Sequence, residues 1–187
     1  MEAFLVSITS IAIAEMGDRT QLLSLVLAAR YRRPWPILAG ILLATLASHT
    51  AAGVLGRWLG RFLSPGVLDI AVGVSMLAMA LWTLKPDNLE EKGEQIRDSS
   101  VLVATFVAFF VAETGDKTQI ATVALAAAYP NLLAVIAGTT CGMLLANAPV
   151  VFLGKAFASR LPLKTIHIVA AILFAVLGVL FIVRGVR

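Results

Sequence analysis

The chain has few charged residues, a single cysteine and little aromatic content. Charged residues make up 14% of its 187 residues and aromatic residues 7%, whereas 59% are hydrophobic and the mean hydropathy is +0.92. A soluble domain of this length cannot bury that much apolar surface, so the shortage of charge excludes soluble enzymes and soluble binding modules. The composition predicts an all-α integral membrane protein.

Other shortages narrow the reading further. The only cysteine, Cys141, excludes an intramolecular disulfide, and its apolar surroundings predict a packing role. The N-terminus lacks the basic region of a signal peptide, so we expect the first apolar segment to be a retained helix. The net charge of +4 does not indicate a nucleic-acid partner, because the Lys and Arg residues lie mainly at the ends of apolar segments.

The charges that do occur within apolar sequence belong to a repeated motif. Residues 14–21 read AEMGDRTQ, and residues 112–119, which lie 98 positions later, read AETGDKTQ. Uncharged stretches precede both copies, at residues 3–14 and 101–112, so the motifs fall near the middle of membrane-length segments. An ionisable side chain at that depth costs at least about 2.5 kcal/mol, and we therefore interpret the motifs as a functional site.

Apolar segments long enough to cross a bilayer, about 20 residues as helices, can be placed six times. The predicted spans are 3–29, 36–56, 66–84, 100–128, 131–153 and 163–183. A polar, charge-rich stretch divides them, which predicts a first three-helix repeat at 1–85, a linker at 86–99 and a second three-helix repeat at 100–187. Small residues four apart, Gly40 with Ala44 and Gly138 with Gly142, predict close helix packing.

Duplication and topology follow from the same 98-residue offset. The pairs Ala39-Gly40 and Ala137-Gly138 also match at this spacing, which supports duplication. Because each half has an odd number of spans, the halves are expected to be inverted repeats. Outside the motifs, nine Lys or Arg residues fall on the side of the linker and four on the other. The positive-inside tendency then places the linker in the cytoplasm and both termini outside it, in a multi-pass protein of the cell (inner) membrane.

The acids of the two motifs are the candidate ligands of a single metal site. They are Glu15, Asp18, Glu113 and Asp116. A spacing of three would place each pair on one helix face. The glycine between them, Gly17 or Gly115, can allow local unwinding, which membranes tolerate where the backbone lines a cavity. Inverted symmetry would bring both motifs together at the midplane.

Charge balance predicts what such a site exchanges. The four acids and the two bases Arg19 and Lys117 sum to minus two, which one divalent cation or two protons would neutralise. Oxygen ligands favour Ca²⁺ or Mn²⁺ over Zn²⁺ or Cu⁺. The accessory candidates are Thr20, Thr118, Gln21, Gln119, Arg19, Lys117, His49 and Asn147. His49 can be a proton relay, a ligand or an interhelical hydrogen-bonding residue.

The pattern Glu-x-Gly-Asp-[Lys/Arg]-Thr, present twice, resembles the Gdt-like family of Ca²⁺/Mn²⁺:H⁺ antiporters, also called the second calcium/cation antiporter family. The resemblance covers essentially the whole chain, and the short chain is similar to bacterial manganese exporters of that family. It implies a transporter rather than an enzyme, with Mn²⁺ or Ca²⁺ as substrate, protons as the exchanged ion and the four acids as the binding residues. Thr114 stands where the family usually has an apolar residue, and this difference leaves the metal preference open. The oligomeric state is open as well.

Three alternatives remain at this point. The acids could be structural partners of the bases four residues later, Glu15 with Arg19 and Glu113 with Lys117. The chain could be a small-solute exporter of the amino-acid type, which shares its size. The two membrane aspartates also resemble those of an intramembrane aspartyl protease, although glutamate stands three residues before each.

Overall fold

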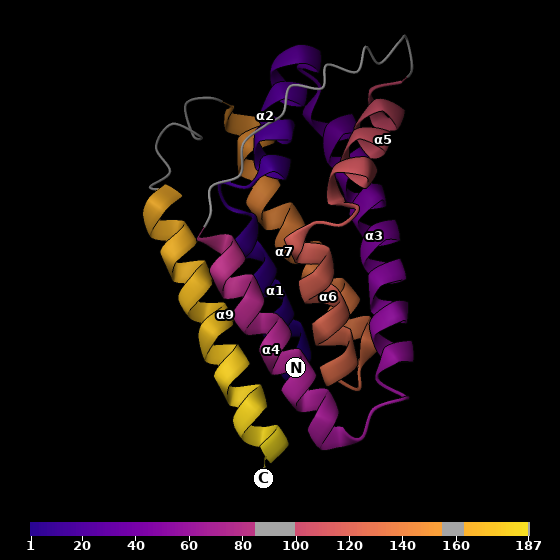
Figure 1. The fold of residues 1–187 in the computed structure, drawn as a ribbon. Coiled ribbons are helices and arrows are strands. Elements are labelled where there is room, and N and C mark those ends of the chain that lie inside the picture. The colour runs from indigo at the N-terminus through magenta and orange to yellow at the C-terminus, as the bar shows by residue number, and fades with distance from the viewer. Residues whose placement is uncertain (85–99, 155–162, 187) are drawn as a thin grey trace.

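A computed structural model describes residues 1–84, 100–154 and 163–186, and the regular secondary structure of these residues is entirely α-helical (Figure 1). The helices are α1 (Glu2–Glu15), α2 (Arg19–Tyr31), α3 (Pro34–Leu59), α4 (Pro65–Thr83), α5 (Val101–Glu113), α6 (Lys117–Ala128), α7 (Leu132–Leu153) and α9 (Leu163–Val186). The predicted all-α class is confirmed. The predicted linker at 86–99 lies outside the described residues.

Two of the predicted spans are interrupted in the middle. The first, expected at 3–29, consists of α1 and α2, and the fourth, expected at 100–128, consists of α5 and α6. In each case the two helices follow one another along the long axis of the bundle (Figure 1). The predicted unwinding at the motifs is confirmed. The expectation that each pair of acids shares one continuous helix face is wrong, because Glu15 ends α1 and Asp18 caps α2.

Within the described residues, four helices are long and apolar enough to cross a membrane: α3, α4, α7 and most of α9. The outer surface is apolar, as on α9, where Ile172, Val176 and Leu180 are each more than half exposed. The interior holds many polar side chains instead, including Ser7, Thr45 and others that are fully buried. This distribution suits a protein whose outer face contacts lipid tails and whose interior supplies the polar partners.

Glycines set how closely the helices approach. A Cβ added at Gly138 on α7 would lie 2.7 Å from the carbonyl oxygen of Phe4 on α1. At the matched position on α3, a Cβ added at Gly40 would lie 2.8 Å from the carbonyl oxygen of Leu102 on α5. Both distances are too short for a real side chain, so only glycine permits these contacts. The predicted close packing around Gly40 and Gly138 is confirmed.

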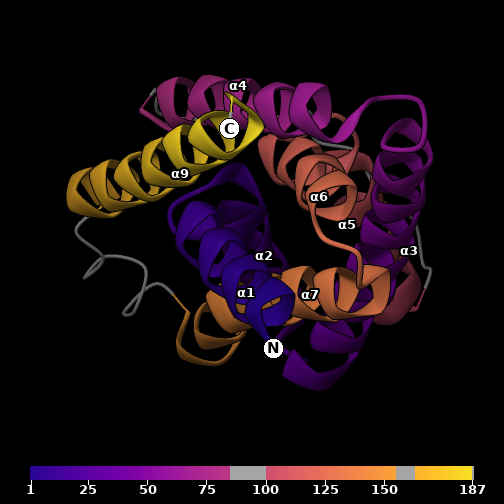
Figure 2. The same cartoon turned by 90° about the horizontal axis from the view of Figure 1, so that it is seen from below.

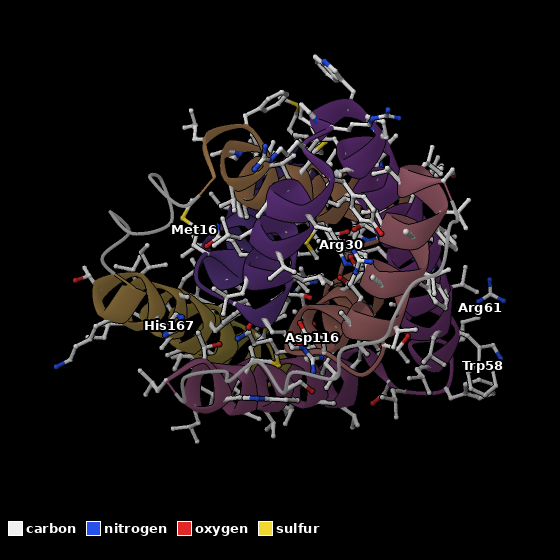
Figure 3. All side chains as sticks on the ribbon, turned by 90° about the horizontal axis from the view of Figure 1, so that it is seen from above. Met16, Arg30, Trp58, Arg61, Asp116 and His167 are labelled. Carbon is white, nitrogen blue, oxygen red and sulfur yellow. The ribbon has the colours of Figure 1, made fainter. Side chains whose placement is uncertain are left out.

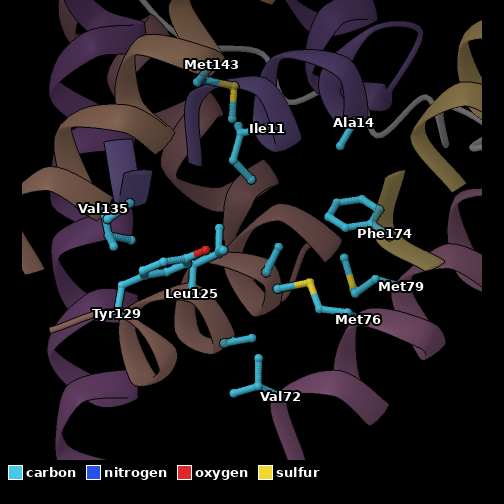
Figure 4. Close-up of a cluster of buried hydrophobic side chains, with 14 of the residues drawn as sticks. Ile11, Ala14, Val72, Met76, Met79, Leu125, Tyr129, Val135, Met143 and Phe174 are labelled. Carbon is cyan, nitrogen blue, oxygen red and sulfur yellow. The ribbon is translucent and has the colours of Figure 1, made fainter. Parts of the chain in front are cut away.

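A further glycine contact joins α4 and α9, which run side by side along one edge of the bundle (Figure 2). Gly73 and Gly178 face each other there, and a Cβ added at Gly73 would lie 2.6 Å from the carbonyl oxygen of Gly178. Apolar side chains fill the space between this pair and the broken helices, among them Met76, Leu125 and Phe174 (Figure 4). The broken helices are therefore packed from several sides.

Candidate functional site

The breaks in the two interrupted spans have the same backbone structure. Gly17 has φ 81° and Gly115 has φ 76°, a left-handed conformation that favours glycine. The amide of Asp18 donates to the carbonyl oxygen of Glu15 at 3.1 Å, and that of Asp116 donates to Glu113 at 3.0 Å. Each aspartate then becomes the N-cap of the following helix. The motif glycine thus turns the chain so that the glutamate ends one helix and the aspartate begins the next.

A glutamine closes each break from the following helix. The amide oxygen of Gln21 accepts from the backbone N–H of Gly17 at 2.7 Å, and that of Gln119 accepts from Gly115 at 2.8 Å. The amide nitrogen of Gln21 donates to the carbonyl oxygen of Ala146 on α7 at 2.9 Å. That of Gln119 donates to the hydroxyl of Ser48 on α3 at 3.1 Å. Because Ser48 and Ala146 are also 98 residues apart, the two clamps are built from matched positions, and each ties its break to a helix of the other half.

Three of the four predicted acids meet at the breaks. Glu15, Asp18 and Asp116 are buried, and one oxygen atom of each lies within 4.8 Å of the others. Asp116 lies inside the bundle when viewed from above, whereas Trp58 and Arg61 lie at its outer edge (Figure 3). Three carboxylates so close together repel one another strongly unless a cation or protons neutralise them. Their oxygen atoms suit a hard divalent cation.

The fourth acid, Glu113, is buried but is not part of this group of three. Its Oε1 accepts a hydrogen bond from the hydroxyl of Thr45 on α3 at 2.5 Å. Glu15, its counterpart, accepts instead from the hydroxyl of Thr20 in its own motif. The hydroxyl of Thr118 donates to Oδ2 of Asp116 at 3.1 Å. The threonines of the motifs therefore orient two of the clustered carboxylates, while Glu113 is held by a helix of the first half.

The two bases cross from one motif to the other. Lys117 Nζ lies 2.5 Å from Oδ1 of Asp18, and a guanidinium nitrogen of Arg19 lies 2.8 Å from Oδ1 of Asp116. These pairs differ from the alternative considered above, in which each base pairs with the glutamate four residues before it in the same motif. Each base sits at the start of one helix and neutralises the aspartate that caps the other. The crossed pairs join the two motifs into one structure.

Exposure differs between the two ends of the site. The side chain of Lys117 is 1% exposed and that of its partner Asp18 is 0% exposed, whereas the side chain of Arg19 is 38% exposed. Thr114 and Gly115 are exposed at the second break, while Gly17 is buried at the first. In this conformation the backbone of the second break is the more accessible one, whereas the more exposed base, Arg19, belongs to the first motif.

Comparison with known proteins accounts for the motifs. The chain matches the family described as "Divalent cation/proton antiporter GDT1" over residues 3–91 and 101–187. It belongs to the GDT1 family of divalent cation/proton antiporters. This is a family of transporters, which removes the protease and the amino-acid exporter from consideration.

Individual relatives of the antiporter agree with this assignment. A Vibrio cholerae protein named "Putative manganese exporter" is 52% identical over 95% of this chain and 89% of its own length. A GDT1-like protein of Synechocystis is 32% identical over 96% of both chains. The divalent cation/proton antiporter GDT1 of Saccharomyces cerevisiae is 22% identical over 99% of this chain and 85% of its own. No solved structure matches the chain.

Two further polar residues that the sequence singled out occupy matched positions on α3 and α7. Asn147 accepts from the hydroxyl of Ser24 at 2.6 Å and donates to the carbonyl oxygen of Met143 at 3.0 Å. His49 is fully buried, and neither ring nitrogen has a hydrogen-bond partner among the described residues. Asn147 thus makes an interhelical contact, whereas the role of His49 as relay or ligand stays a prediction.

Three hydroxyl side chains that contact site residues were not predicted from the sequence. They are Ser24, Thr45 and Ser48. Thr45 and Ser48 lie within one turn of His49, so polar side chains recur on one face of an otherwise apolar span. This recurrence is the feature of the sequence from which a polar face of α3 toward the site could have been predicted. Which acid or amide they contact depends on how α3 packs against α5 and α6, which the spacing alone does not reveal.

The left-handed glycine at the second break can be tested without a steric clash. A Cβ added at Gly115 would meet nothing within 4 Å, so Gly115→Ala strains only the backbone. We expect this change to lower the free energy of unfolding by about 1 to 2 kcal/mol, seen as a lower melting temperature of the detergent-purified antiporter. Gly115→Asn should lose less, since asparagine tolerates this conformation. Equal stability of wild type and Gly115→Ala would contradict the assigned backbone conformation.

Proposed function

We propose that this antiporter exports Mn²⁺ in exchange for protons, with Glu15, Asp18, Glu113 and Asp116 as the acids of the shared ion site. The observation that carries the proposal is the group of three buried carboxylates at the two helix breaks. Two of them pair with a base from the other motif, Asp18 with Lys117 and Asp116 with Arg19. The name of the Vibrio relative supports Mn²⁺ as the substrate.

Charge balance explains why exchange suits this site. Asp18 and Asp116 are each paired with a base, so the uncompensated charge of minus two falls on Glu15 and Glu113. One Mn²⁺ or two protons would neutralise it equally. An empty, doubly negative site is costly to move through a low-dielectric protein, so only the loaded forms cross readily. Substrate and protons then share one set of acids and alternate in occupying it.

The proposed architecture is six membrane spans in two inverted three-helix repeats, residues 1–85 and 100–187, joined by the linker. In each repeat a broken span, α1 with α2 or α5 with α6, is followed by two continuous ones. The matched clamps of Gln21 and Gln119 and the matched contacts of Gly40 and Gly138 support the pairing of the halves. Broken helices that meet at an ion site are typical of transporters built from inverted repeats.

Coupled flux is the direct test of the proposed exchange. Purified antiporter in liposomes with an acidic lumen should take up Mn²⁺ as protons leave, because both ions compete for the same acids. Uptake is followed with a Mn²⁺-quenched dye and lumenal pH with a second dye. Protein-free liposomes measure leakage. Mn²⁺ uptake that ignores the pH gradient would point to a channel and refute exchange.

Single amide substitutions test the assigned acids. Glu15→Gln, Asp18→Asn, Glu113→Gln and Asp116→Asn each keep shape but remove one negative charge, so each should slow exchange. For an acid that contacts the cation, the loss of a charge-assisted contact costs about 1.5 to 3 kcal/mol, or roughly ten- to a hundredfold in Mn²⁺ affinity. The matched control is Asp69→Asn. Asp69 is also buried, but its carboxylate lies 3.0 Å from Arg184 and is not part of the ion site. If any of the four site variants transported at the wild-type rate, the shared site would be wrong.

Sidedness can be measured independently of transport. The positive-inside tendency places Arg33 on the cytoplasmic side and Arg61 on the opposite side. Both are exposed, so single cysteines there, in a Cys141→Ala background, are accessible to labels. A membrane-impermeant maleimide added to intact cells should label position 61 and spare position 33. The reverse pattern would invert the proposed orientation and leave the repeats intact.

A further inference from the structure

The matched halves differ in what holds their glutamates. Glu15 and Glu113 are 98 residues apart, and so are Thr45 on α3 and Met143 on α7. The hydroxyl of Thr45 donates to Oε1 of Glu113 at 2.5 Å, whereas Met143 has no hydroxyl to offer. The packing around them is otherwise alike, since Gly40 and Gly138 make matched contacts with α5 and α1. Glu113 therefore has a hydroxyl donor on α3, whereas the hydroxyl donors of Glu15 are the motif threonines Thr20 and Thr118.

The positions of the two carboxylates follow this difference. Glu15, which the motif threonines Thr20 and Thr118 bind instead, lies in the group with Asp18 and Asp116. Glu113, which Thr45 holds, lies outside that group. The other oxygen of Glu113, Oε2, is buried and has no hydrogen-bond partner among the described residues. Thr45 therefore holds this carboxylate from α3, with the hydroxyl of Ser48 on the same helix close to it.

Met143, the counterpart of Thr45, cannot hold Glu15 as Thr45 holds Glu113. Its side chain is fully buried, and its sulfur atom lies 3.1 Å from the amide nitrogen of Asn147. A thioether cannot donate a hydrogen bond, so it has nothing with which to draw Glu15 away from the group. The difference between Thr45 and Met143 therefore has a direct consequence for how many carboxylates reach the ion.

The number of carboxylates matters for the choice between two hard cations. Ca²⁺ takes about six to eight oxygen ligands in flexible geometry. Mn²⁺ is satisfied by an octahedral set of about six, part of which water can supply. A site that offers three carboxylates and withholds the fourth therefore disfavours Ca²⁺ more than Mn²⁺.

We propose that Thr45 is a positioning residue that sets the preference for Mn²⁺ over Ca²⁺ by keeping Glu113 out of direct contact with the ion. This inference rests on the proposed function and adds the selectivity of the same site. Thr45 acts through Glu113 and does not itself contact the ion. Removing the hydroxyl releases the fourth carboxylate, which joins the other three and completes a larger coordination shell.

The test compares Mn²⁺ and Ca²⁺ affinities of detergent-purified variants by calorimetry. Thr45→Val removes the hydroxyl at nearly constant volume, and we expect the ratio of Ca²⁺ to Mn²⁺ dissociation constants to fall about tenfold, the value of one charge-assisted hydrogen bond. Thr45→Ser restores a hydroxyl and should restore the ratio. The matched control is Thr139→Val, because Thr139 is equally buried but its hydroxyl donates to the carbonyl oxygen of Ile136 in its own helix at 3.1 Å.

A double-substitution cycle separates this role from a structural one. Glu113→Gln in the Thr45→Val background should cancel the gain in Ca²⁺ affinity, since the released group is then no longer a carboxylate. In the wild-type background, Glu113→Gln should weaken Mn²⁺ binding less than Glu15→Gln. The second comparison holds even if Thr45→Val does not fold.

The outcomes are distinguishable from those of the proposed function. An unchanged affinity ratio in Thr45→Val, or equal losses of Mn²⁺ affinity in Glu113→Gln and Glu15→Gln, would overturn the role of Thr45 while Mn²⁺/proton exchange stands. A wild-type protein that binds neither Mn²⁺ nor Ca²⁺ would overturn the proposed function itself.

Discussion

The crossed ion pairs are the interaction on which the rest of the site depends. Asp18 and Asp116 cap helices that start in the buried interior of the bundle, where an isolated charge is very costly. Lys117 and Arg19 neutralise them from the opposite motif, at 2.5 and 2.8 Å. Because each motif supplies the base that pairs with the other's aspartate, the two aspartates are neutralised across the halves of the chain. This mutual dependence explains why acid, glycine, acid and base recur together.

The glutamine clamps are subject to the same constraint. A helix break inside a membrane leaves backbone groups without partners, and these must be satisfied by protein. Gln21 and Gln119 bind the N–H of the motif glycines, and their remaining donors reach α7 and α3. Breaks, clamps and ion pairs thus hold one another in place. The carboxylates are positioned by this framework before any ion arrives, which lowers the cost of ordering them on binding.

The sequence predicted the helical class, the broken spans and the closeness of the motifs, because two strong constraints act locally: charge is expensive in apolar sequence, and glycine marks a left-handed turn. It did not predict which charges pair. Arg19 lies four residues after Glu15 and can in principle reach acids of either copy, so spacing alone cannot choose. It also overlooked Thr45, since a threonine in a membrane span is usually satisfied by its own helix. Only the packing of α3 against α5 shows that this hydroxyl faces Glu113.

Differences between the copies are as informative as their likeness. Two identical halves would present the same site to both sides of the membrane, whereas a transporter has to open toward one side at a time. The copies differ at 16 and 114, at 19 and 117, and at 45 and 143. At 16 and 114 the second motif is the more exposed one, whereas at 19 and 117 the first motif is, since Arg19 is 38% exposed and Lys117 is 1% exposed. The shared residues therefore build the ion site, and the substituted pairs 16/114 and 19/117 give its two ends different exposure to solvent.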